Sequence, residues 1–154
     1  MPMPHPRSSP QASSQTRYRV LLVDDDAAVL RGLAAVLEFD LDVVTCTSAE
    51  RALTLLRDEE FHAVCSDYTM PGMNGLELFA IVAQLPRPVA CLLLTGSAEF
   101  IDRGGSADQY VLMKPVDPAR LSSLLIQLSR TVAMKRSTAQ RGALREREVA
   151  RGTG

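Results

Sequence analysis

Residues 65–75 read CSDYTMPGMNG, and they place a carboxylate, that of Asp67, at the end of a short apolar run. The Pro, Gly and Asn residues that follow favour turns, so the strand predicted at 62–66 ends at Asp67 and a loop comes next. Asn74 is the predicted N-cap of a helix, with Glu77 three residues later at the reciprocal position of a capping box. The stretch therefore predicts a strand, an acidic side chain and a loop that opens a helix.

Polar residues also end other apolar runs of the chain. The predicted strands cover residues 18–23, 42–46, 62–66, 89–94 and 110–113. The polar residues that follow three of them are Asp24, Asp25 and Asp26, then Thr95, and finally Lys114. Strands that alternate with helices favour a parallel sheet with right-handed crossovers, and ligands bind beyond the carboxyl ends of its strands. We therefore expect these side chains and Asp67 at one edge of a sheet.

The helices between the strands are predicted from their caps and apolar stripes. The first covers residues 27–38, and its stripe consists of Leu30, Leu33, Ala34 and Leu37. Thr47 is the predicted N-cap of the second helix, with Glu50 as its capping-box partner. The last helix begins after Asp117 as N-cap, with Pro118 as its first residue. Five βα units of this kind predict an α/β fold, a doubly wound five-stranded parallel sheet.

Length and composition are those of one domain. The chain has 154 residues, 46% of them hydrophobic, which is enough for one core. Its net charge of −1 gives no overall attraction to nucleic acid or membranes, and its few aromatic residues argue against a base-stacking surface. No apolar run approaches about 18 residues, and residues 1–6 lack the apolar core of a signal peptide. We therefore expect a cytoplasmic protein without a membrane partner.

The three cysteines, Cys46, Cys65 and Cys91, lie in predicted strands. An odd number without paired spacing argues against a disulfide framework, and no Cys/His cluster has the spacing of a zinc site. We expect them to be small buried residues in a reducing compartment.

The two ends of the chain differ in composition from its middle. Residues 1–16 are rich in Pro, Ser and Gln without periodicity, which predicts a disordered leader before a domain over 17–133. Residues 134–154 carry six Lys and Arg residues against two Glu residues. They are too few for a DNA-binding domain, so no direct DNA binding is expected. Two alternatives remain for this tail: an extension of the last helix, frayed or disordered, and a basic arm that contacts a partner or polyanion.

The polar residues at the predicted sheet edge suit a magnesium and phosphoryl site. Mg²⁺ prefers oxygen ligands and keeps several waters, so one or two carboxylates are enough to hold it. Crowded carboxylates repel one another, which favours a divalent cation between them. Such a cation can align a phosphoryl donor beside one carboxylate, which acts as the nucleophile and becomes an acyl phosphate. A lysine at a nearby strand end supplies a positive charge for a phosphoryl oxygen.

Five separated features together resemble the receiver domain of two-component response regulators, over residues 17–133. They are Val23-Asp24-Asp25-Asp26, Asp67 with Met70-Pro71-Gly72 and Asn74-Gly75, Thr95-Gly96, Lys114-Pro115, and the order of strands and helices. The resemblance implies a flavodoxin-like strand order of 2-1-3-4-5. It also implies a stand-alone, single-domain response regulator in a phosphorelay. Such a protein is not a general enzyme, since it catalyses only its own phosphotransfer and dephosphorylation.

By this resemblance, Asp67 accepts a phosphoryl group from a sensor histidine kinase or a histidine phosphotransfer protein. Asp25 is the direct ligand of Mg²⁺, for which Mn²⁺ can substitute, and Asp24 acts mostly through a water. Asp67 itself and the backbone carbonyl of Thr69 complete the protein ligands. The phosphorylated protein then signals to a separate target, which the sequence does not identify.

The same resemblance assigns the residues around the phosphoryl group. Thr95 is the switch hydroxyl that moves onto this group, and Lys114 is its salt-bridge partner. Gly96 leaves room for the group to enter, while Thr69 and Ser97 flank it.

The strand before Lys114 departs from the receiver pattern. An aromatic residue is typical three positions before the lysine, but Val111 stands there and Tyr110 comes one residue earlier. Because a shift of one residue on a strand reverses the face, Tyr110 is not assigned a switching role.

The segment after Thr95 is a second departure, because it is shorter than in typical receivers. Gly104 and Gly105 interrupt the stretch that should form the fourth helix, where each glycine costs about 1 kcal/mol relative to alanine. We expect this fourth helix, over 98–106, to be a single turn or a disordered, mobile loop that takes part in signalling.

Other functions are weighed against this interpretation. A pseudo-receiver would bind partners without phosphorylation. A phosphatase of the haloacid-dehalogenase type would use Asp24 and Asp26 as its Asp-x-Asp pair, but Ala28 stands where that family prefers Thr or Val. Asp26 is interpreted instead as a helix-start acid that the helix dipole favours. A receiver cut from a longer hybrid protein, and a symmetric homodimer through the fifth strand and last helix, are further alternatives.

Overall fold

The computed structural model describes residues 16–96 and 109–152. The predicted disordered leader lies almost wholly outside these residues. The segment 98–106, predicted as a short or mobile fourth helix, and Ser97 also lie outside them. Both structural expectations therefore stay predictions.

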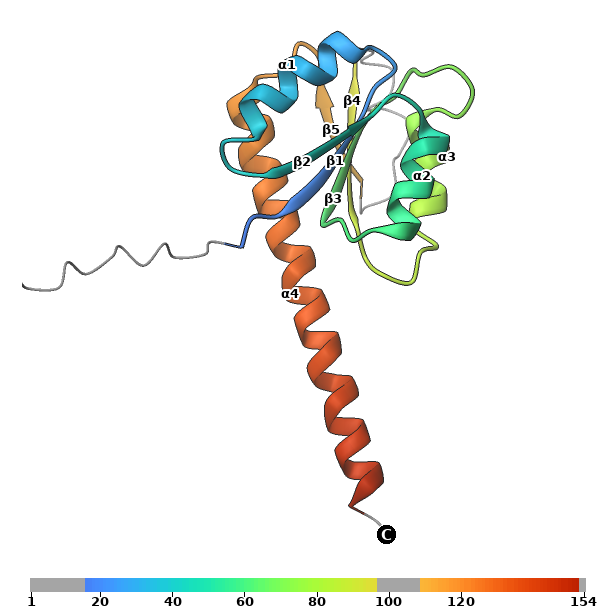
Figure 1. Ribbon diagram of the computed structural model, residues 1–154, viewed down its shortest axis with the longest axis vertical. Helices are drawn as coiled ribbons and strands as arrows, with labels where there is room; N and C mark the ends of the chain where they lie inside the picture. Colours follow the sequence, from blue (N-terminus) through green and yellow to red (C-terminus); the bar gives the residue numbers. More distant parts are fainter. Residues whose placement is uncertain (1–15, 97–108, 153–154) are drawn as a thin grey trace, which may run out of the picture.

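Five parallel strands form one sheet in the order β2-β1-β3-β4-β5 (Figure 1). The strands are β1 (Arg19–Val23), β2 (Asp42–Cys46), β3 (Ala63–Asp67), β4 (Ala90–Thr95) and β5 (Gln109–Met113). Each predicted strand is present to within about one residue, and the predicted order is confirmed. All five residues of β3 are buried, as expected where helices cover both faces of a parallel sheet.

Helices cover both faces of this sheet. α1 (Ala27–Leu37) and α4 (Pro118–Arg151) pack on one face, and α2 (Ala49–Asp58) and α3 (Gly75–Val82) pack on the other (Figure 1). Successive side chains of a strand point to opposite faces, so the sheet divides the core into two clusters. Leu22 lies in the cluster beneath α1 and α4, and Leu21 lies in the cluster beneath α2 and α3. This arrangement confirms the predicted doubly wound α/β fold.

The start of α2 corrects one prediction. Its N-cap is Ser48 and not Thr47, because the Ser48 hydroxyl accepts a hydrogen bond from the backbone N–H of Arg51 at 3.2 Å. Glu50 then stands one position too early to complete a capping box, so that prediction was wrong. Serine and threonine are both good N-caps, and burial decides between them. Ala49 is fully buried as the first residue of the helix, which sets where α2 begins.

The predicted capping box of α3 is confirmed. The Asn74 side chain accepts hydrogen bonds from the backbone N–H groups of Leu76 and Glu77, and the Glu77 carboxylate accepts one from Asn74. Gly75 then packs against the end of β3, where a Cβ would lie 2.6 Å from the carbonyl oxygen of Asp67. α3 therefore begins in direct contact with the strand end that carries Asp67.

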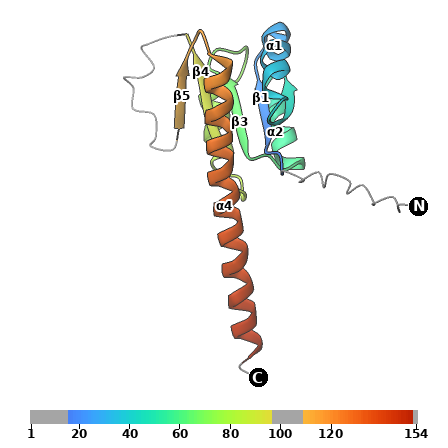
Figure 2. The same ribbon diagram turned by 90° about the vertical axis from the view of Figure 1, so that its left-hand side faces the viewer.

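The last helix begins as predicted, with Asp117 as N-cap and Pro118 in its first turn. It runs for 34 residues, so residues 134–151 continue the helix and leave the body of the domain (Figures 1 and 2). Its last buried residue is Val132. The sheet therefore covers only the first part of α4.

Arg136 ties α4 to the domain at the point where the helix leaves it. Its guanidinium donates hydrogen bonds to the backbone carbonyls of Phe61 and Pro88, the latter at 2.7 Å. These residues precede β3 and β4. The direction of the projecting helix is therefore fixed from the amino end of the sheet.

All three cysteines are free and buried, as predicted. Burial raises the pKa of Cys46 to about 11 and the pKa values of Cys65 and Cys91 to about 12. The thiolate, which is the reactive form, is therefore scarce near neutral pH, and these side chains serve as core.

We expect Gly75→Ala to lower the free energy of unfolding by about 1–3 kcal/mol. The added methyl group would collide with the Asp67 carbonyl oxygen and with Leu93 Cδ1, which lies 2.7 Å away. Gly32→Ala in α1 is the matched control, because a Cβ there meets no atom within 4 Å. It should raise the free energy of unfolding by up to about 1 kcal/mol through helix propensity. Urea denaturation measures both, and equal effects would contradict the packing argument.

Candidate functional site

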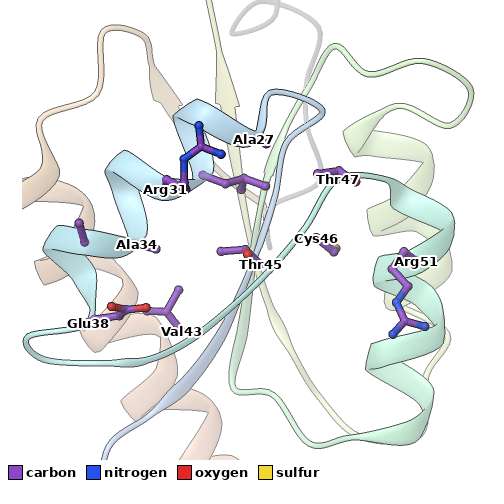
Figure 3. A pocket seen from close by; sticks show the side chains of 11 residues that line it. Ala27, Arg31, Ala34, Glu38, Val43, Thr45, Cys46, Thr47 and Arg51 are labelled. Carbon is purple, nitrogen blue, oxygen red and sulfur yellow. The ribbon is translucent and has the colours of Figure 1, made fainter.

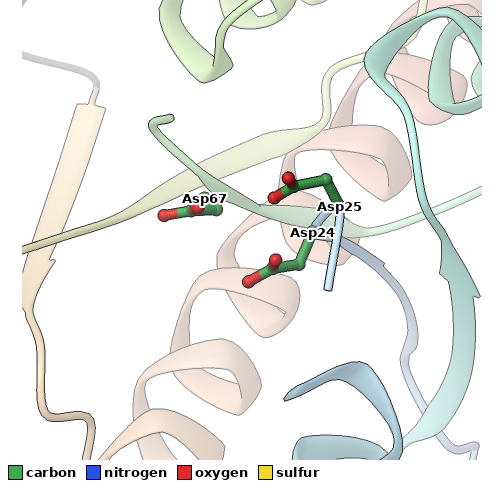
Figure 4. Close-up of side chains that lie close together, drawn as sticks. All are labelled: Asp24, Asp25 and Asp67. Carbon is green, nitrogen blue, oxygen red and sulfur yellow. The ribbon is translucent and has the colours of Figure 1, made fainter. Parts of the chain in front are cut away.

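Three carboxylates from two strand ends lie together at the carboxyl edge of the sheet (Figure 4). Asp24 and Asp25 follow β1, and Asp67 ends the neighbouring strand β3. One oxygen from each carboxylate lies within 4.8 Å of the others. The strand register brings them there, because Val23 at the end of β1 pairs with Ser66, the residue before Asp67.

The three side chains differ in exposure. Asp24 and Asp67 keep only 4% and 8% of their surface accessible, whereas Asp25 is exposed. The loop after β1 also holds Asp24 in place, because the backbone N–H of Asp26 donates to its Oδ1 at 2.9 Å. Asp25 therefore offers an accessible oxygen ligand beside two fixed, buried ones.

Lys114, which follows β5, reaches the same place. Its ammonium nitrogen lies 2.9 Å from Oδ1 of Asp67 and 3.9 Å from Oδ2 of Asp24. The backbone N–H of Lys114 donates to the carbonyl of Thr95 at 2.8 Å, which fixes where the side chain starts. Burial by itself lowers the pKa of Lys114, but the hydrogen bond to Asp67 and the nearby carboxylates outweigh it, so the pKa is raised. The lysine stays protonated and partly neutralises the cluster.

The carboxylates still repel one another. The pKa of Asp24 is raised, mainly by burial and also by the charges of Asp67 and Asp25. The N–H of Asp26 and the ammonium of Lys114 act in the opposite direction without cancelling the rise. A divalent cation would offset this repulsion, since it binds carboxylate oxygens and favours their charged form. The residues present therefore fit Mg²⁺.

The other residues predicted for the site lie along the same edge. Thr95 ends β4, the strand beside β3, and its side chain is buried. Gly96 follows it, and a Cβ at Gly96 would meet no described atom within 4 Å. Thr69 lies two residues after Asp67, in the loop before α3, with an exposed side chain. Ser97 falls outside the described residues.

Asp26 turns away from the other acids that follow β1. Its carboxylate accepts hydrogen bonds from the backbone N–H groups of Ala28 at 2.9 Å and Val29 at 3.4 Å, so it is the N-cap of α1. This confirms its interpretation as a helix-start acid. A catalytic pair of Asp24 and Asp26 is disfavoured, because α1 already uses the Asp26 carboxylate.

Tyr110 and Val111 face opposite sides of β5. Val111 packs against the cluster beneath α2 and α3, whereas its neighbour Leu112 belongs to the cluster beneath α1 and α4. Tyr110 shares the face of Leu112 and is about half exposed. The expected reversal of face is therefore present.

A shallow hollow of about 640 Å³ lies between α1, β2 and the start of α2 (Figure 3). Arg31 of α1 and Arg51 of α2 stand on either side of it, with Thr45 of β2 between them. None of the three clustered carboxylates lines this hollow. The candidate chemistry therefore lies at the carboxyl edge of the sheet and not in this hollow.

Sequence reasoning missed two contacts of the cluster. The hydrogen bond from the Asp26 N–H to Asp24 joins residues two apart, a turn that aspartate commonly forms, so the triple aspartate was its signal. The approach of Lys114 to Asp24 had no local signal. It arises because the parallel sheet brings the carboxyl ends of β1, β3 and β5 to one edge, where the long side chain of Lys114 reaches past the end of β4 to Asp67 and to Asp24.

A comparison with known protein families decides the identification. The family model of the response regulator receiver domain matches residues 20–126, which is more than half of the chain. The chain belongs to the response regulator receiver family. Receivers are signalling domains of two-component phosphorelays that accept phosphoryl groups and normally bind Mg²⁺. The resemblance inferred from the five sequence features is confirmed.

Relatives of this receiver include longer proteins. The two-component response regulator ARR14 of Arabidopsis thaliana is 35% identical over 114 residues, which cover 69% of this chain and 29% of that protein. The DNA-binding response regulator MtrA of Mycobacterium bovis is 32% identical over 110 residues, which cover 68% of this chain and 47% of that protein. The chain thus spans less than half the length of these curated relatives.

Solved receiver structures share the fold. The receiver domain protein (CheY-like) from Methanospirillum hungatei JF-1 is 28% identical and aligns with a TM-score of 0.68. The alignment covers 78% of this chain and 99% of that one. The similarity therefore extends over the whole length of a receiver domain.

We expect Asp24→Asn to raise the free energy of unfolding at pH 7 in metal-free buffer, by on the order of 1 kcal/mol. The folded protein raises the pKa of Asp24, so its ionised form destabilises the fold at pH 7. Below the ordinary pKa of aspartate, Asp24 is protonated in both the folded and the unfolded protein, so it no longer destabilises the fold. The Asp24→Asn variant and the unchanged protein should then differ little in free energy of unfolding. Asparagine also keeps an oxygen for the Asp26 N–H.

Urea denaturation at pH 7 and at about pH 3 measures this difference. Glu146→Gln is the control, because it removes an exposed carboxylate from the projecting end of α4. A destabilised Asp24→Asn protein at pH 7 without metal would contradict the electrostatic argument.

Proposed function

We propose that this receiver is a single-domain response regulator whose Asp67 accepts a phosphoryl group from a sensor histidine kinase or a histidine phosphotransfer protein. The placement of Asp67 carries the proposal. Its carboxylate lies at a sheet edge with Asp24 and Asp25 within 4.8 Å and the Lys114 ammonium at 2.9 Å. A carboxylate in that position is a nucleophile between a cation site and a fixed positive charge.

In the proposed reaction, an oxygen of the Asp67 carboxylate attacks the phosphorus of a phosphohistidine. The new O–P bond forms as the N–P bond breaks, and the imidazole leaves with that electron pair and takes up a proton. Asp24, Asp25, Asp67 and the backbone carbonyl of Thr69 would hold Mg²⁺ or Mn²⁺. When bound, the cation supplies charge neutralisation for the transferred phosphoryl oxygens.

Lys114 and Thr95 would receive the transferred group. The Lys114 ammonium, now hydrogen-bonded to Asp67, would follow the phosphoryl oxygens, which add about −1.5 to −2 charges. The Thr95 hydroxyl, from the strand between β3 and β5, is the donor that moves onto the group. Gly96 would leave room for it, and Thr69 would lie beside it. These movements would change the partner-binding surface near β4 and β5.

The setting of the site suits a protein as phosphodonor. Asp25 is exposed beside the buried Asp24 and Asp67, so the phosphohistidine of another protein could approach the cluster from the side of Asp25. The chain would act as a phosphoacceptor with no general enzymatic activity. A separate downstream target, a cytoplasmic location and a homodimer through β5 and α4 remain predictions. In the described parts of the chain, no helix has the length and apolar character to cross a membrane.

We expect one added phosphoryl group when the protein is incubated with Mg²⁺ and acetyl phosphate, and none in Asp67→Ala. Intact-mass spectrometry measures the adduct. Mn²⁺ should replace Mg²⁺, and a chelator should abolish the reaction, because the cation neutralises the transferred group. An adduct that persists in Asp67→Ala would place the acceptor elsewhere.

Other outcomes of this experiment identify the alternatives. No adduct, either with acetyl phosphate or with a phosphorylated kinase, would favour a pseudo-receiver. Steady turnover of a phosphate ester that is lost in Asp24→Asn but kept in Asp67→Asn would favour the phosphatase.

We expect Mg²⁺ to raise the melting temperature, because a ligand that binds only the folded state stabilises it by about 2.7 kcal/mol at a hundred times its Kd. Asp25→Asn should lose most of this response, since it removes the accessible ligand. Asp26→Asn is the control: asparagine caps a helix as well as aspartate, and Asp26 faces α1. Thermal unfolding across a Mg²⁺ titration compares them. Equal losses in both variants would mean that net charge, and not ligation by Asp25, governs binding.

A further inference from the structure

The projecting part of α4, residues 134–151, is here called the basic arm (Figures 1 and 2). It carries six Lys and Arg residues against Glu146 and Glu148. The rest of the chain carries 11 Lys and Arg residues against 16 Asp and Glu residues. Positive charge is therefore concentrated on a helical segment that leaves an otherwise acidic molecule.

Five of the six basic side chains of the arm are exposed. Arg136 is held by the carbonyls of Phe61 and Pro88. The other five are exposed, and they are Lys135, Arg141, Arg145, Arg147 and Arg151. From residue 138 to residue 152 every side chain is exposed, so the arm is anchored at its base and accessible along its length.

The four exposed arginines of the arm lie on one side of the helix. Arg141 and Arg145 are four residues apart, as are Arg147 and Arg151, so each pair stacks along the helix axis. At about 100° per residue, the two pairs lie about 120° apart around the axis. The opposite side carries small residues, which are Ala139, Gly142, Ala143 and Ala150. Two rows of guanidinium groups therefore flank one face of the helix.

The apolar residues of the arm argue against two kinds of partner. The arm has three large apolar residues, Met134, Leu144 and Val149. The first two are ten residues apart and the last two are five apart, so they do not form the apolar stripe of a coiled coil. The same scatter leaves no apolar face that could enter a membrane interface. A second copy of the arm and a lipid surface are both disfavoured.

The charges of the arm favour a polyanion. The two guanidinium groups of each arginine pair repel each other, which destabilises the helix by a few tenths of a kcal/mol. A partner with closely spaced negative charges relieves that repulsion. The arm has no aromatic residue on which the bases of a single strand could stack. The deep, narrow major groove of double-stranded RNA does not admit side chains. The major groove of B-form DNA is about 12 Å wide and accepts a helix about 10–12 Å across.

We propose that the basic arm binds double-stranded DNA, with the helix in the major groove and its two arginine pairs on the phosphates of the two flanking strands. The face between the pairs carries Leu144 and Glu148. Because the arginines contact phosphates, which carry no sequence information, we expect binding that is independent of sequence. This inference replaces the expectation of no direct DNA binding, which rested on the shortness of the tail. A continuous helix needs no domain of its own, because α4 already holds it. The inference does not depend on phosphorylation of Asp67.

The test is fluorescence anisotropy of a labelled duplex of about 30 base pairs with the full chain. We expect a Kd of roughly 10⁻⁴ to 10⁻⁶ M that rises steeply with salt, as for phosphate contacts. The double variant Arg141→Gln/Arg145→Gln should weaken binding by about tenfold and flatten the salt dependence. The matched control is Arg31→Gln/Arg120→Gln, which removes two exposed charges from the body and should change binding by less than about twofold.

A second pair of variants tests the orientation of the helix. Glu148 lies between the two arginine pairs, and Glu146 lies on the opposite side, so Glu148→Gln and Glu146→Gln change the net charge equally. Glu148→Gln should tighten binding about threefold, and Glu146→Gln should have less effect. Equal gains would overturn the groove-facing arrangement.

Three results would overturn the proposal as a whole. They are no binding at low salt, equal weakening in the arm variant and its control, and tighter binding to single-stranded DNA or to vesicles of anionic phospholipid than to the duplex.

Discussion

Two carboxylates and one ammonium group, from three different strand ends, are held together at the edge of this sheet. Asp24 and Asp67 would separate if they were free in water, because their charges repel. They cannot do so here, since β1 and β3 are hydrogen-bonded neighbours in fixed register. Lys114 reaches both carboxylates and offsets part of the repulsion. The remaining excess of negative charge makes this edge receptive to a divalent cation and then to a phosphoryl group.

The surrounding elements serve this arrangement through close packing. Gly75 lets α3 begin against the carbonyl of Asp67, and the capping box of Asn74 and Glu77 closes the loop between them. Asp26 caps α1 with its side chain while its backbone N–H holds Asp24. The loops after β1 and β3 therefore each cap a helix and also hold a residue of the site in place. A receiver needs this combination, because a switch depends on loops that hold their starting positions.

The basic arm shows how the body of the domain gives a short segment a defined surface. Read as sequence, residues 134–151 are a basic stretch with little apolar periodicity, and an isolated helix of that length is marginal in water. The structure makes it the continuation of a helix whose first half is buried against the sheet, with Arg136 fixed at its base. That continuity decides which arginines share a face.

Sequence by itself determined the order of strands and helices, the residues that end each strand, and membership of the receiver family. Those features depend on interactions within a few residues, such as the caps at Asn74 and Asp117, and on the periodicity of apolar residues. The start of α2 shows the limit, because Ser48 and Thr47 are both good local caps and the burial of Ala49 favours the later start. Only the tertiary structure decided that Lys114 reaches Asp24 and that the arm projects from the body. These depend on strand register, burial and contacts between residues far apart in the chain, which no local pattern encodes.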